Sequence, residues 1–179
     1  MSFTKPLPVL ALLPVAFIVI ETTHVLGHAL AALACGCRLE NITLFGLQLH
    51  PGLAFTGFRL VSWAGYSQPT TAWCEGFIRV MGSGFNVFIA TVSVALLVLL
   101  RPHGLPRIIL CYLSLFTLDI AVYTIHPFLN LLPWRVLEYP EAMYGASQIG
   151  IPAGAFATGM IAVFVATFSL AAWQMRLPT

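Results

Sequence analysis

The sequence predicts an all-α membrane protein with four transmembrane helices and a small β-hairpin element after the first. Hydrophobic residues make up 59% of the 179-residue chain and charged residues only 8%, whereas soluble domains average about 45–50% apolar and about 25% charged residues. Four apolar runs are long enough to cross a bilayer, and a segment with turn signals separates the first two. We expect a single integral membrane domain over residues 1–179.

The four predicted spans cover, by length and apolarity, about residues 7–34, 77–100, 108–132 and 149–173. The first run exceeds the apolar core of a cleaved signal peptide, which is about 7–15 residues long, so we interpret it as a span. Lysine and arginine divide evenly between the two sides of the membrane in this topology. The sequence therefore predicts a multi-pass integral membrane protein and leaves its orientation open.

The segment between the first two spans has the character of strands. Residues 41–50 carry β-branched side chains with partial alternation, Pro51-Gly52 is a turn signal, and residues 53–60 form a second strand-like run. This pattern predicts a β-hairpin or small sheet. Because open sheet edges are not tolerated against lipid, we expect it in the membrane interface or covered by protein.

Charge and cysteine content restrict the function only broadly. The net charge of +2 is too small to favour nucleic-acid binding. We expect the partners to be membrane lipid and other membrane proteins, as substrates or as members of a complex. The cysteines Cys35, Cys37, Cys74 and Cys111 are interpreted as small apolar residues in or near the membrane, and the first two are too close in sequence to favour a disulfide with each other.

Three ionisable residues, Glu21, His24 and His28, lie inside the first predicted span. Their spacing of i, i+3 and i+7 places them on one helical face, and ionisable groups in hydrocarbon mark functional sites. Two imidazoles one turn apart suit a single metal ion, although such a pair also serves to tie helices together by hydrogen bonds or to bind haem or another pigment. Glu21 has three candidate roles: metal ligand, hydrogen-bond partner of an imidazole, or catalytic base.

A catalytic zinc ion usually has three protein ligands and one open position, so a third ligand is expected elsewhere in the chain. The candidates outside the first span are Asp119, Glu138, His126 and His50. Asp119 lies well inside the third predicted span, at a depth that matches that of His24, and Glu138 follows the end of that span. Asp119 and Glu138 are therefore the two alternatives that we prefer for the third ligand.

Two motifs resemble those of the site-2 protease family of intramembrane zinc metallopeptidases. Members carry His-Glu-x-x-His in one transmembrane helix and Asn-x-x-Pro followed by Leu-Asp-Gly in a later one. Here His24-Val25-Leu26-Gly27-His28-Ala29 matches the first motif at both histidines, and Asn130-Leu131-Leu132-Pro133 matches the second, with Leu137-Glu138 in place of Leu-Asp. The run at 81–86, with its glycines and asparagine, is also similar to the family. The resemblance covers about residues 15–140.

The resemblance implies a zinc ion bound by His24, His28 and Glu138, and intramembrane metallopeptidase activity. Val25 stands where the family has the glutamate that serves as general base, and valine cannot transfer a proton. We therefore expect a site-2-protease-like membrane protein that binds zinc but is non-proteolytic or has altered peptidase chemistry. Two alternatives stay open: a structural subunit of a larger membrane complex without metal, and a haem- or pigment-binding membrane subunit.

Overall fold

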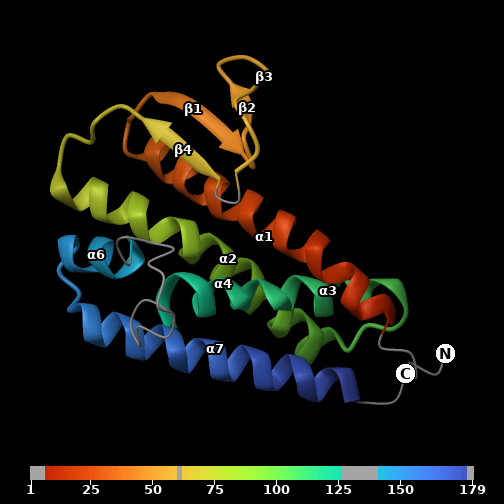
Figure 1. Ribbon diagram of the computed structural model, residues 1–179. Helices are drawn as coiled ribbons and strands as arrows, with labels where there is room; N and C mark the ends of the chain where they lie inside the picture. Colours follow the sequence, from red (N-terminus) through yellow and green to blue (C-terminus); the bar gives the residue numbers. More distant parts are fainter. Residues whose placement is uncertain (1–6, 60–61, 126–140, 177–179) are drawn as a thin grey trace.

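The computed structural model describes residues 7–59, 62–125 and 141–176 (Figure 1). It confirms the predicted fold class and the multi-pass membrane character. Four helical segments are long and apolar enough to cross a membrane: Pro14–Ala34, Ala72–Leu100, Leu105–Ile125 and Ala153–Gln174. A small antiparallel sheet follows the first of them, as the sequence predicts.

Helices α1 (Leu7–Ala34) and α2 (Ala72–Leu100) form the principal helix pair of the fold. Helix α2 begins earlier than its apolar run suggests because Thr71 caps it, its side chain accepting the Cys74 backbone N–H at 3.1 Å. The two helices approach closely at Gly27, where a Cβ atom would lie 2.2 Å from the Met81 carbonyl oxygen. This contact brings the polar face of α1 against α2.

The third span is not a regular α-helix. It consists of α3 (Leu105–Ser114), the 3-10 helix η1 (Leu115–Thr117), the short α4 (Leu118–Ile120) and the π-helix η2 (Ala121–Ile125). The predicted continuation of this span to residue 132 lies outside the described residues. Irregular helical turns of this kind are frequent at functional sites, and this one carries Asp119 on α4 and Tyr123 on η2.

Two helices complete the described bundle: α6 (Glu141–Gln148) and the fourth span, α7 (Ala153–Arg176). The sequence analysis did not predict α6. It packs tightly on α2, because a Cβ atom on Gly76 would lie 2.5 Å from the Gly145 carbonyl oxygen and one on Gly145 would lie 2.6 Å from the Gly76 carbonyl oxygen. This glycine contact fixes the position of α6 relative to α2.

The sheet contains four strands: β1 (Leu39–Leu44), β2 (Leu47–His50), β3 (Ala54–Phe55) and β4 (Trp63–Tyr66). Their order is β3-β2-β1-β4, and every neighbouring pair is antiparallel. The predicted hairpin corresponds to β1, β2 and β3, whereas β4 was not predicted.

The sheet lies along α1 rather than beyond its end (Figure 1). At the β1–β2 turn the Phe45 ring is 6.0 Å from the ring of Phe17, which precedes His24 by two helical turns. Strand β4 also packs against α1. The sheet therefore covers the part of α1 that carries the two histidines.

Candidate metal site

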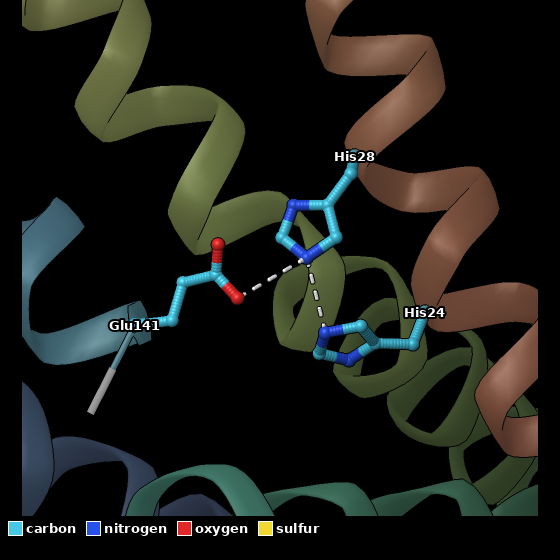
Figure 2. A group of neighbouring side chains, drawn as sticks. All are labelled: His24, His28 and Glu141. Carbon is cyan, nitrogen blue, oxygen red and sulfur yellow. Dashed lines mark hydrogen bonds and ion pairs between the residues drawn. The ribbon is translucent and has the colours of Figure 1, made fainter. Parts of the chain in front are cut away.

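His24 and His28 face each other inside the protein (Figure 2). Their residues are only 5% and 8% exposed, and their Nε2 atoms lie 3.0 Å apart. Both side chains project from one face of α1, as their spacing predicts. A methyl group on Gly82 of α2 would lie 2.3 Å from His28 Nε2 and 2.6 Å from His24 Nε2, so only glycine fits beside the two rings.

The hydrogen-bond partners of the two Nδ1 atoms determine where the ring protons are. His28 Nδ1 lies 2.7 Å from the Ile78 carbonyl oxygen, which can only accept, so this nitrogen carries the proton. His24 Nδ1 lies 2.8 Å from Asp119 Oδ1 and donates to the carboxylate. In the neutral rings each Nε2 therefore presents a lone pair to the other. A metal ion or an additional proton between the two atoms would relieve the repulsion of these lone pairs.

Asp119 lies on the Nδ1 side of the His24 ring, away from Nε2. Its Oδ1 atom also accepts from Asn86 Nδ2 at 2.9 Å, and the same Asn86 amide donates to the Ile20 carbonyl oxygen at 3.0 Å. The Thr23 hydroxyl donates to Asn86 Oδ1. This placement favours Asp119 as the group that orients His24, and its predicted role as a direct ligand stays a prediction.

Glu141, in the first turn of α6, supplies a carboxylate on the Nε2 side of the histidines (Figure 2). Its Oε2 atom lies 3.8 Å from His28 Nε2, and one ligand atom from each of Glu141, His24 and His28 lies within 4.8 Å of the others. The sequence analysis did not propose Glu141 as a ligand. The available signal was an acidic residue directly after Pro140, a pattern typical of a helix start.

Arg79 of α2 forms an ion pair with the other carboxylate oxygen of Glu141. Its NH1 atom lies 3.8 Å from Glu141 Oε1, and its NH2 atom donates to Glu75 Oε1 at 2.9 Å. The guanidinium also lies 5.1 Å from the centre of the Tyr144 ring, on the same short helix as Glu141. Arg79 thereby leaves Glu141 Oε2 directed at the histidines.

Glu21 is buried beside this site and pairs with a tyrosine. The Tyr123 hydroxyl donates to Glu21 Oε1 at 2.6 Å, and the Ser62 backbone also hydrogen-bonds this carboxylate. The Tyr123 ring stacks on the His24 ring with centroids 4.1 Å apart. Glu21 thus supports the site through Tyr123, and its candidate role as a base stays a prediction.

The remaining predicted ligands do not join this group in the described part of the chain. Glu138 and His126 lie outside the described residues. His50 lies at the end of β2 and is exposed to solvent.

A cavity of about 110 Å³ opens beside the three ligand atoms. It is lined by His24, His28, Glu141 and Tyr123, and on the sheet side by Trp63 and Tyr66. Burial raises the pKa of the Tyr66 phenol above its ordinary value, so at neutral pH this side chain is protonated and can donate a hydrogen bond into the cavity. The cavity has room for a few water molecules or a small group.

Comparisons with protein-family models, curated proteins and solved structures gave no match for this chain.

Proposed function

We propose that this membrane protein binds one divalent metal ion, with zinc as the preferred ion, through His24, His28 and Glu141. The observation that carries the proposal is the pair of Nε2 lone pairs that face each other at 3.0 Å in a buried site. The hydrogen bonds that both Nδ1 atoms donate prepare the rings for this role, as is usual for histidines that bind metals.

The distances suit a metal centre that requires a small closure. Two ligands bound tetrahedrally at about 2.0–2.1 Å lie about 3.3 Å from each other. The two Nε2 atoms are already near that separation, at 3.0 Å, and Glu141 Oε2 needs to approach His28 Nε2 from 3.8 Å by roughly half an ångström. All three ligand atoms lie within 4.8 Å of one another, so the widest pair has to close by up to about 1.5 Å. Glu141 is half-exposed, so its side chain has the freedom to make this movement.

The donor set also supports zinc. Two imidazoles and one carboxylate form a known catalytic zinc set that leaves a fourth position open. When bound, such an ion can polarise a carbonyl group and activate water. The cavity of about 110 Å³ beside the site favours a single ion and small ligands over a tetrapyrrole, which makes the haem or pigment alternative the least favoured.

We further propose that the protein is a relative of the site-2 proteases without their usual peptidase chemistry. Val25, at the position of the family's general base, is fully buried and cannot accept a proton. Glu21 is the nearest acid on α1, but its carboxylate is engaged by Tyr123. The residues therefore support metal binding more strongly than peptide hydrolysis.

The proposal is tested by metal analysis of tag-free protein purified in detergent. We expect about one zinc ion per chain in the wild type and in His50→Ala, a matched control that removes an exposed histidine. His24→Ala and His28→Ala should lose the ion, and Glu141→Gln should weaken binding while leaving the buried part of the site intact. Circular dichroism establishes that each variant is folded.

A wild-type protein that stays free of zinc after loading, with helical content equal to that of the loaded sample, would refute the proposal. The histidine pair would then share a proton and tie helices together. That result would leave the structural-subunit alternative.

A further inference from the structure

Two cysteines lie together at the junction between α1 and α2, apart from the metal site. Cys35 directly follows the last residue of α1, and Cys74 lies in the first turn of α2, 39 residues later. The Cys35 Sγ atom lies 4.0 Å from the Cys74 carbonyl oxygen, so the two residues are direct neighbours in space. Both residues are partly exposed at the surface of the protein.

We propose that Cys35 and Cys74 form a reversible disulfide that covalently links the end of α1 to the start of α2. Because the Cys35 sulfur already lies 4.0 Å from the Cys74 backbone, rotation of the two side chains and a small approach would bring the sulfur atoms to bonding geometry. Cys37 is buried in a cluster with Ala31 and Ile78, so it is the less accessible partner for either thiol.

The reaction is an exchange with a small disulfide such as glutathione disulfide. Burial and the neighbouring Cys74 raise the pKa of Cys35 to about 11, so Cys35 is a thiol at neutral pH, and we assign it the second step. The Cys74 thiolate attacks one sulfur, the glutathione disulfide bond breaks, and one glutathione leaves. Cys35 then loses its proton to solvent and attacks the mixed disulfide at Cys74, which releases the second glutathione. The protein loses two electrons and two protons, and glutathione disulfide is reduced to two thiols.

The bond would restrain the part of the fold that orients His28. Ile78, whose carbonyl oxygen binds His28 Nδ1, lies one turn after Cys74 on α2. His28 lies two turns before Cys35 on α1. The disulfide would therefore close a loop that contains the whole sheet and would hold α1 and α2 in register next to the metal site. The proposal does not depend on whether a metal is bound.

The test uses the full-length wild-type protein in detergent, treated with glutathione disulfide, alkylated and analysed by mass spectrometry. Before alkylation, we expect an intact mass lower by two hydrogens than that of the reduced protein. After alkylation, two of the four cysteines should carry the label. Proteolysis should then yield a fragment that joins Cys35 to Cys74. The midpoint of thermal unfolding should rise by at least about 5 °C, and dithiothreitol should reverse both changes.

Single serine variants identify the pair. Cys37→Ser and Cys111→Ser should form the bond like the wild type, whereas Cys35→Ser and Cys74→Ser should not. Four alkylated cysteines in the oxidised, folded wild type, or a linkage that includes Cys37, would overturn the proposal. Fragment mapping of the wild type alone gives this answer even if a variant does not fold.

Discussion

Replacing Gly82 with alanine adds one methyl group at the point where α2 meets both imidazoles. The new Cβ atom would lie 2.3 Å from His28 Nε2, and ordinary contact begins at 3.4 Å, so the His28 ring would have to retreat by about 1.1 Å. That movement would strain the 2.7 Å hydrogen bond from His28 Nδ1 to the Ile78 carbonyl oxygen. Overpacking of this kind costs about 1–3 kcal/mol.

If the strain acts on the metal site, the dissociation constant for zinc should rise about five- to 150-fold. The assay is competition with a fluorescent zinc chelator, using tag-free protein in detergent. Gly84→Ala is the matched control because its Cβ atom would lie 3.4 Å from Met81 Sδ, an ordinary contact, on the same helix. Both variants gain the same helix propensity. Equal zinc affinity in Gly82→Ala and Gly84→Ala would refute the placement of the ion between the two rings.

Two further substitutions test the groups that surround the histidines. Asp119→Asn keeps the shape of the side chain but removes the charge that holds His24 Nδ1, so we expect zinc affinity in the same chelator assay to fall about 10- to 100-fold; unchanged affinity would argue against an orienting role. Tyr123→Phe removes the hydroxyl that donates to Glu21 and leaves a buried carboxylate with one partner fewer, which should lower the free energy of unfolding by about 1–3 kcal/mol in a denaturant titration while zinc stoichiometry stays the same. Loss of zinc in this variant would instead make the phenol part of the metal site.

The four spans and the shared face of the histidines could be predicted because they depend on local pattern. Long apolar runs and the i, i+4 spacing of His24 and His28 are visible in the sequence alone. The role of Glu141 could not be predicted in this way. It depends on how α6 packs against α2 through Gly76 and Gly145, and such a contact between distant segments leaves no periodic signal.

Asp119 illustrates the same limit in a different form. Its depth in the third span matches that of His24, and the two side chains lie 2.8 Å apart. Depth does not specify which ring nitrogen it reaches. The choice of Nδ1 depends on Asn86, which holds Asp119 from α2 and also anchors to the Ile20 carbonyl oxygen.

The separation of 95 residues between His24 and Asp119 has a consequence for biosynthesis. Chains are made at about 5–20 residues per second, so α1 leaves the ribosome roughly 5 to 20 seconds before the partner of its first histidine. During that interval α1 carries Glu21 and both imidazoles without Asp119 or Tyr123, and polar or ionisable groups in hydrocarbon are costly without partners. The third span therefore lowers the cost of keeping these groups in the membrane, because Asp119 and Tyr123 supply the hydrogen-bond partners that α1 lacks when it is made.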